Sequence, residues 1–139
     1  MGEAWVAEVK MGKRAKILLV DDDPDFIEAT RTVLETQPYE VLTALSGEEG
    51  LKKAKEEKPD LVLLDIIMPG VDGFQVCQQL KKDPQLSQIP VIMITSFSEK
   101  YMETSIGLSQ GLSLEAEDFI DKPVAPTELL IRVDKWLRK

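Results

Sequence analysis

The chain of 139 residues contains no histidine and a single cysteine, Cys77. Without histidine the protein has no imidazole metal ligand, no Ser-His-Asp triad and no residue that could carry a phosphohistidine. One cysteine excludes an internal disulfide, and a reducing cytoplasm is the simplest location for such a protein. Cys77 occupies an apolar position of a helical pattern, so we interpret it as a buried helix residue and not as a nucleophile.

Basic residues and long apolar runs are also scarce. The 17 Lys and Arg residues are outnumbered by 25 Asp and Glu residues, and the net charge is −8. DNA backbones and anionic membrane surfaces attract concentrated positive charge, so this balance argues against direct nucleic acid binding and against membrane docking. No run is long and apolar enough to span a bilayer. The first residues lack the basic start, apolar middle and cleavage site of a secretory signal.

The residues that are present suit one globular domain. The chain length fits a single domain, and an apolar fraction of 43% is enough for a core. We expect residues 1–15 to be an N-terminal tail or extension, in which Trp5, Val6 and Val9 could line one side of a short helix. Residues 16–139 are expected to form the domain.

Apolar strand-like runs alternate with segments of helical periodicity. The five expected strands are residues 16–20, 39–45, 61–64, 91–94 and 119–120. The first, third and fourth runs are continuously apolar, as is typical of strands buried on both faces of a parallel sheet. The alternation therefore predicts an α/β fold with right-handed crossovers and helices on both faces of the sheet.

Most of the expected helices have readable ends. Asp23 followed by Pro24 predicts an N-cap and a first helical residue. The other expected helix starts are at Ser46, which resembles a capping box with Glu49, at Asp72 and near Pro126. Residues 98–117 contain two glycines and few apolar residues, so this segment could be a shorter helix followed by a long loop.

Polar side chains follow the buried strands directly. Asp21 and Asp22 follow the first strand, Asp65 the third, Thr95 the fourth and Lys122 the fifth. Parallel sheets bind ligands outside the carboxyl ends of their strands, so we expect these side chains to converge. Three carboxylates held together require a cation, and Mg²⁺ prefers such oxygen ligands. The lysine and the threonine add donors for an anion, which is an arrangement suited to phosphoryl transfer with Asp65 as the nucleophile.

The segments VDDDP, LLDIIMPGVDG, ITS and DFIDKP, in this order, closely resemble the receiver domain of two-component response regulators. The resemblance covers nearly the whole chain after Lys16. It implies a flavodoxin-like (βα)5 fold, a doubly wound five-stranded parallel sheet of order 2-1-3-4-5. It also implies a signalling switch that catalyses only its own phosphorylation and dephosphorylation, and not an enzyme that turns over a substrate.

The resemblance implies roles for the acidic residues. Asp65 would be phosphorylated by a sensor histidine kinase or a histidine phosphotransfer protein, with Mg²⁺ as the cofactor. Asp22 would ligate Mg²⁺ directly and Asp21 more remotely through water, with Asp65 completing the acidic set. Ile67, two residues beyond Asp65, would offer its backbone carbonyl to the metal.

The resemblance also implies a switch. Thr95 would move to hydrogen-bond the phosphoryl group, Lys122 would pair with it, and Phe119 would turn inward when Thr95 moves. The Lys122–Pro123 bond is usually cis in the family. Receivers commonly dimerise or dock an output partner through the face of the fourth helix, fifth strand and last helix. No DNA-binding domain follows the last helix, so we expect a stand-alone receiver or the receiver portion of a longer chain.

The chain departs from the family pattern in two places. The segment 98–117 is somewhat longer than usual, and Ala-Glu-Asp at 116–118 replaces the common Gly-Ala pair before the fifth strand, which leaves the partner open. Ile67 and Phe97, two positions after the acceptor aspartate and the threonine, are apolar and cannot position an attacking water. We therefore expect a comparatively long-lived phosphoryl group.

Several residues also have purely structural interpretations. Asp23 is better explained as an N-cap, and Asp25 as a first-turn acid favoured by the helix dipole. Phe119 could be an ordinary core residue, and Asp121 is expected to face solvent. Ser96 could replace Thr95 as a donor, although it ranks below it.

Three other functions are alternatives to the signalling switch. A Mg²⁺-dependent phosphohydrolase of the haloacid dehalogenase type also uses a strand-end aspartate, but its first motif has Thr or Val where Asp25 stands, and it needs an acidic pair on a strand after Lys122. A flavin-binding relative would need a hydroxyl- and glycine-rich loop after the first strand, where this chain is acidic. The third alternative is a degenerate receiver that only docks, against which the full set of site residues argues.

Overall fold

The computed structural model describes residues 14–68, 70–95 and 116–138. Its five strands are β1 (Ala15–Val20), β2 (Tyr39–Ala44), β3 (Leu61–Asp65), β4 (Val91–Thr95) and β5 (Asp118–Asp121). They form one parallel sheet in the order β2-β1-β3-β4-β5. The predicted α/β class, the parallel sheet and its strand order are confirmed.

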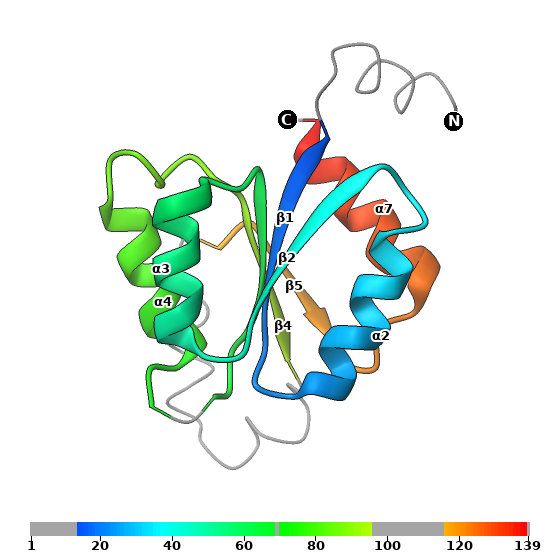
Figure 1. The fold of residues 1–139 in the computed structure, drawn as a ribbon, viewed down its shortest axis with the longest axis horizontal. Coiled ribbons are helices and arrows are strands. Elements are labelled where there is room, and N and C mark those ends of the chain that lie inside the picture. The colour runs from blue at the N-terminus through cyan, green and yellow to red at the C-terminus, as the bar shows by residue number, and fades with distance from the viewer. Residues whose placement is uncertain (1–13, 69, 96–115, 139) are drawn as a thin grey trace.

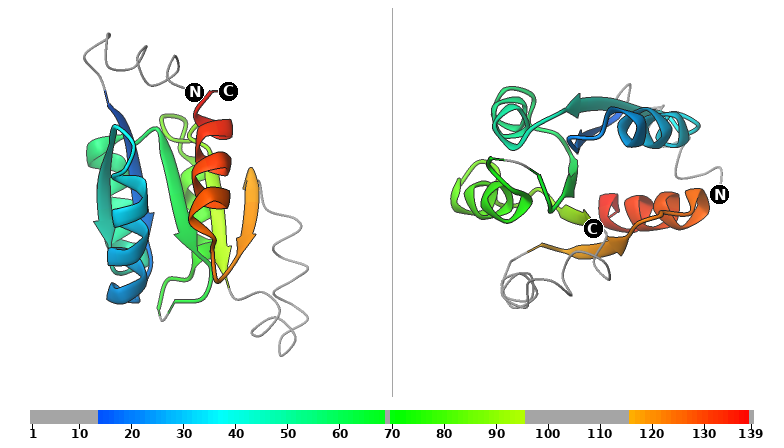
Figure 2. Two further views of the ribbon diagram at one scale, coloured as in Figure 1. Left: turned by 90° about the vertical axis from the view of Figure 1, so that its right-hand side faces the viewer. Right: turned by 90° about the horizontal axis from the view of Figure 1, so that it is seen from below.

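Two pairs of helices cover the two faces of this sheet. The described helices are α2 (Pro24–Leu34), α3 (Gly47–Glu57), α4 (Gly73–Lys82) and α7 (Pro126–Leu137). Figures 1 and 2 show α3 and α4 on one face and α2 and α7 on the other. The segment expected at 98–117 lies outside the described residues except for its last two, and the expected tail lies outside them up to residue 13. No helix in the described ranges is both long and apolar enough to cross a membrane.

The core consists of two apolar clusters, one on each face of the sheet. In β1, Leu18 and Val20 belong to the cluster under α3 and α4, whereas Ile17 and Leu19 belong to the cluster under α2 and α7. All five residues of β3 are buried. Side chains of a strand alternate between faces, so a strand covered on both sides is apolar along its length, as β3 is from Leu61 to Leu64 before it ends in Asp65.

Helix α2 begins immediately beyond the carboxyl end of β1. The Asp23 side chain accepts hydrogen bonds from the backbone N–H groups of Asp25 at 3.0 Å and Phe26 at 3.4 Å. Pro24 supplies the first helical residue, where its missing N–H costs nothing. The predicted cap at Asp23 is confirmed, and it fixes the first turn of α2 beside the acidic strand end.

The caps of α3 and α4 differ from one another. The Ser46 hydroxyl accepts the N–H of Glu49 at 3.1 Å, as predicted, but the Glu49 carboxylate accepts the N–H of Leu45 at 2.9 Å instead of that of Ser46. This hydrogen bond lowers the pKa of Glu49. The reciprocal capping box occurs at α4, where Asp72 and Gln75 each accept the other's backbone N–H at 3.0 Å. Helix α4 therefore starts at a defined point shortly after β3.

Candidate functional site

The register of the sheet places two aspartates side by side. Val20 of β1 pairs with Leu64 of β3, so Asp21 and Asp65, the next residues of these two segments, leave the same edge together. The N–H of Asp21 donates to the carbonyl of Ala44 at 3.1 Å, which extends the hydrogen-bonded ladder one residue beyond β1. The backbone thus fixes both side chains at the carboxyl edge of the sheet.

Asp21, Asp22 and Asp65 form an acidic cluster at this edge. One carboxylate oxygen from each residue lies within 4.8 Å of the other two. Asp21 is 1% exposed and Asp65 is 6% exposed, whereas Asp22 is open to solvent. Buried carboxylates require a compensating charge, and a set of hard oxygen ligands open to water on one side suits Mg²⁺. The cluster could therefore hold a divalent metal ion.

Lys122 provides the positive charge that the structure places beside this cluster. Its Nζ lies 3.0 Å from Oδ2 of Asp21 and 3.7 Å from Oδ1 of Asp65. Lys122 is the first residue beyond β5, and its bond to Pro123 is cis, as predicted. Asp121 is exposed, also as predicted. Two of the acids and the lysine are thus brought together from three different strand ends.

Burial dominates the electrostatics of Asp21. Desolvation raises the pKa of its carboxyl group, and the raising effect exceeds the opposing effects of the Asp23 N–H at 2.9 Å and of Lys122. The carboxylate form of Asp21 is therefore not fully compensated by the protein groups around it. A bound cation would supply the missing compensation.

For the remaining predicted site residues, the structure describes at most the position and not the predicted role. The backbone of Thr95 pairs with Asp121 at the end of β4, but its side chain lies outside the described part of the structure, as do Ser96 and Phe97. Ile67 is half-buried two residues beyond Asp65. Phe119 is half-buried and packs against the core cluster under α3 and α4. The metal role of Ile67 and the switch roles of Thr95 and Phe119 stay predictions.

Two contacts, one at the site and one at the opposite edge of the sheet, were not predicted from the sequence. The ammonium of Lys122 lies over the ring of Phe26, 4.2 Å from the ring centroid. At the opposite edge of the sheet, Lys81 at the end of α4 forms a salt bridge with Glu117 just before β5, at 3.0 Å. Residue spacing alone gave no signal for either contact.

Comparison with known proteins agrees with the fold and the site. Residues 17–134 match the family described as the response regulator receiver domain. The chain is 41% identical over 124 residues to the alkaline phosphatase synthesis transcriptional regulatory protein PhoP of Bacillus subtilis, covering 89% of this chain and 49% of PhoP. It is 42% identical over 123 residues to the protein PilH of Pseudomonas aeruginosa, covering 88% of this chain and 98% of PilH.

Solved structures show the same likeness. The signal receiver domain of a signal transduction histidine kinase from Syntrophus aciditrophicus has a TM-score of 0.81 and 32% identity, covering 89% of this chain and 90% of that chain. The chemotaxis protein CheY4 of Vibrio cholerae has a TM-score of 0.77 and 28% identity, covering 88% of this chain and 98% of that chain. The chain spans about half the length of PhoP and of several other curated relatives that it matches.

Proposed function

Because this chain belongs to the family of response regulator receiver domains, we propose that it accepts a phosphoryl group on Asp65 and acts as a switch in two-component signal transduction. One observation carries the proposal: three carboxylates converge within 4.8 Å, and the Lys122 ammonium lies 3.7 Å from Oδ1 of Asp65. This arrangement supports Asp65 as the nucleophile, beside a candidate metal site and the positive charge of Lys122.

The proposed reaction is a displacement at phosphorus. A carboxylate oxygen of Asp65 forms a new bond to the phosphorus of a phosphohistidine, the phosphorus–nitrogen bond breaks, and the imidazole nitrogen keeps the electron pair. The Lys122 ammonium stabilises the charge on the phosphoryl oxygens, because a preformed charge costs no reorganisation during the reaction. These 139 residues contain no histidine, so a phosphohistidine donor would lie outside them.

The acidic cluster is proposed to hold Mg²⁺ as the cofactor. Asp22 is proposed as a direct ligand and Asp21 as a more remote one acting through water, with Asp65 and the carbonyl of Ile67 completing the protein ligands. When bound, Mg²⁺ supplies further positive charge against the phosphoryl oxygens. The exposure of Asp22 supports its role, since a ligand open to solvent leaves room for the waters that Mg²⁺ retains.

The proposed output is a change in affinity for a partner. Thr95 and Phe119 are proposed to rearrange on phosphorylation and to alter the face that contains β5 and α7. A histidine kinase or a histidine phosphotransfer protein is the proposed donor, and an output protein or domain, or a second copy of the chain, is the proposed partner on that face. The chain covers only half of PhoP, so the output of the whole protein is not carried over from it.

The phosphohydrolase alternative has no support in the described residues. That site needs an acidic pair on a strand after the lysine, and among residues 116–138 only helix α7 follows Lys122. The degenerate docking receiver differs from the proposal by a single property, the ability to accept phosphate.

Intact mass spectrometry after incubation with acetyl phosphate tests the proposal. The wild type is expected to gain one phosphoryl group in the presence of Mg²⁺ and none with a chelator, and Asp65→Asn is expected to gain none. A wild-type protein that binds Mg²⁺ but gains no phosphoryl group from acetyl phosphate or from any histidine kinase tried would support the degenerate receiver instead.

A further inference from the structure

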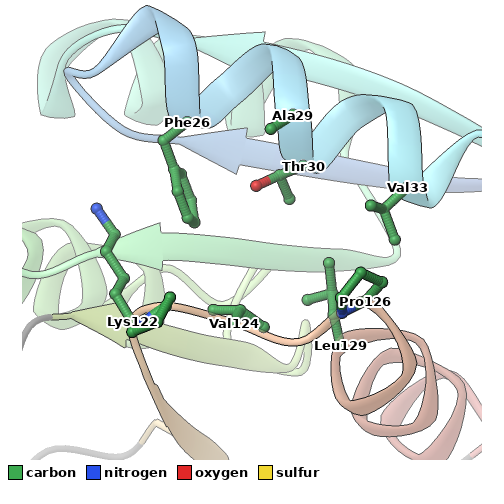
Figure 3. A pocket seen from close by; sticks show the side chains of 9 residues that line it. Phe26, Ala29, Thr30, Val33, Lys122, Val124, Pro126 and Leu129 are labelled. Atoms are coloured by element: carbon green, nitrogen blue, oxygen red, sulfur yellow. The ribbon is translucent and has the colours of Figure 1, made fainter.

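The Lys122 ammonium is held by a neutral aromatic partner as well as by two acids. Its Nζ lies 3.0 Å from Asp21, 3.7 Å from Asp65 and 4.2 Å from the centroid of the Phe26 ring. Figure 3 shows the two side chains extending toward each other, Phe26 from the first turn of α2 and Lys122 from the segment after β5. The contact joins two elements that lie at opposite ends of the chain.

A ring partner suits this place better than a third acid would. The face of an aromatic ring attracts an ammonium through its quadrupole, without carrying a net charge. A further carboxylate would repel an incoming phosphoryl group and would compete for the metal ion. The ring therefore restrains the lysine while leaving the local charge unchanged.

The lysine needs such a restraint because its stem is flexible. Four carbons carry the ammonium, and its shorter contact is with Asp21 and not with Asp65, the acid to be phosphorylated. Attraction to the ring confines the ammonium to the space between the two elements. From there it can reach a phosphoryl group on Asp65 with less loss of conformational freedom.

Phe26 packs against the core cluster under α2 and α7, but its side chain is not fully covered there. Phe26 is half-buried and lines a cavity of about 490 Å³ between α2 and α7, together with Thr30, Val33, Val124 and Leu129. The ring is therefore only partly enclosed by neighbouring side chains. Its N-terminal position is fixed by the Asp23 cap, which accepts the N–H of Phe26 itself.

We propose that Phe26 is a positioning residue that holds the Lys122 ammonium for phosphoryl transfer to Asp65. The inference rests on the proposed function, since it concerns the same reaction. It adds a residue on α2 to a site otherwise built from strand ends.

The test compares three variants. Phe26→Leu removes the ring face and keeps an apolar side chain, Phe26→Tyr keeps the ring, and Val33→Ala changes the same cavity at a residue that is not among the contacts of Lys122. The initial rate of phosphorylation by acetyl phosphate with Mg²⁺ is expected to fall about fivefold in Phe26→Leu, as the loss of one partly desolvated cation–π contact implies. Phe26→Tyr and Val33→Ala are expected to stay within about twofold of the wild type.

A second measurement detects the contact between Lys122 and Phe26 independently of phosphorylation. In NMR spectra, assigned with a Lys122→Arg variant, the Hε protons of Lys122 are expected to be shifted upfield by the ring in the wild type and in Phe26→Tyr, and to return to ordinary values in Phe26→Leu. Urea unfolding shows that each variant is folded.

Each outcome has one meaning. Phosphorylation of Phe26→Leu at the wild-type rate, or an equal loss in Val33→Ala, overturns the positioning role. Unshifted Lys122 protons in the wild type overturn the contact itself. Failure of the wild type to accept phosphate would instead refute the proposed function, while the NMR comparison would still decide whether the ring holds the lysine.

Discussion

Asp21 shows how a single buried carboxyl group couples the site to the stability of the domain. Its side chain is 1% exposed, and burial raises its pKa above the ordinary value of 3.8. As the pH rises past 3.8, the unfolded chain loses this proton while the folded chain still keeps it. Since the folded state then binds more protons, the contribution of Asp21 to the free energy of unfolding falls as the pH rises through this window.

Asp21→Asn is therefore expected to flatten the dependence of stability on pH in metal-free buffer. Urea unfolding with a chelator, at several pH values from 3.8 upward, should show the wild type losing stability relative to the variant. Asp25→Asn, at an exposed first-turn acid, serves as the matched control. Parallel curves for the wild type and Asp21→Asn would contradict the account.

Gly73 matters because α4 begins directly against the end of β3. A Cβ at this position would lie 2.3 Å from the carbonyl oxygen of Asp65 and 2.6 Å from Cα of Ile66. Gly73→Ala must therefore displace the backbone at Asp65 and Ile66. We expect a loss of about 1–3 kcal/mol in the free energy of unfolding, together with weaker Mg²⁺ binding.

Gly70→Ala provides the comparison for that prediction. Gly70 has a φ of +77°, but nothing lies within 4 Å of a Cβ built there. The variant should lose about 1 kcal/mol through backbone strain alone and keep its affinity for Mg²⁺. Equal effects of the two variants on Mg²⁺ binding, measured by titration calorimetry, would show that the close approach at Gly73 does not position Asp65.

The sequence predicted that polar side chains following the strands converge, and it missed contacts that depend on side-chain placement. The proximity of Asp21, Asp65 and Lys122 could be inferred from the sequence because the carboxyl ends of parallel strands meet at one edge of the sheet. The contact of Lys122 with Phe26 depends on where the first turn of α2 lies relative to the end of β5. No periodicity in the sequence encodes that distance.

At the scale of elements, Lys81 and Glu117 join α4, β4 and β5. The Lys81 side chain is 7% exposed, and its Nζ contacts Glu117 at 3.0 Å and the carbonyls of Ser87 and Ile89 at 3.3 and 3.1 Å. Glu117 in turn accepts the N–H of Val91 at 2.7 Å. Lys81 and Glu117 thus fix the starts of β4 and β5 relative to the end of α4.

Removing one partner of this pair should be costly. Glu117→Gln leaves a nearly buried ammonium without its counter-ion, and we expect a loss of about 3 kcal/mol in urea unfolding, the low end for a buried pair because Glu117 is 28% exposed. Glu57→Gln removes the partner of Lys16 in an exposed pair and should cost less than about 1 kcal/mol. Similar losses of unfolding free energy in both variants would mean that the buried pair stabilises the fold no more than the exposed pair does.

The elements themselves were largely predictable. Continuous apolar runs identified the central strands, and the caps at Asp23, Ser46 and Asp72 marked helix starts. The capping box expected at Ser46 was incomplete because the Glu49 carboxylate reaches the N–H of Leu45 instead. Such a one-residue shift depends on side-chain reach, which residue spacing does not specify.

At the scale of the whole molecule, the proposed metal site would couple metal binding to folding. The acidic cluster exists only when β1 and β3 are paired, so an ion bound there stabilises the folded state and not the unfolded chain. At a Mg²⁺ concentration 100-fold above Kd, the free energy of unfolding should rise by about 2.7 kcal/mol.

Urea unfolding with Mg²⁺ and with K⁺ at equal ionic strength measures this gain. The wild type is expected to be stabilised by Mg²⁺, and Asp22→Asn, which lacks a proposed direct ligand, is expected to lose most of the effect. An equal gain in unfolding free energy in both proteins would mean that the ion binds elsewhere. A wild type that gains no more stability from Mg²⁺ than from K⁺ would contradict the proposed metal site.

The most direct test of the central claim identifies the phosphorylated residue. The protein is treated with acetyl phosphate and Mg²⁺, the acyl phosphate is reduced with borohydride, and the digested peptides are sequenced by mass spectrometry. We predict that residue 65 alone is converted from aspartate to homoserine and that the conversion requires Mg²⁺. Conversion at residue 21 or 22, or at no residue of a protein shown to bind Mg²⁺, would contradict the assignment of Asp65 as the phosphoryl acceptor.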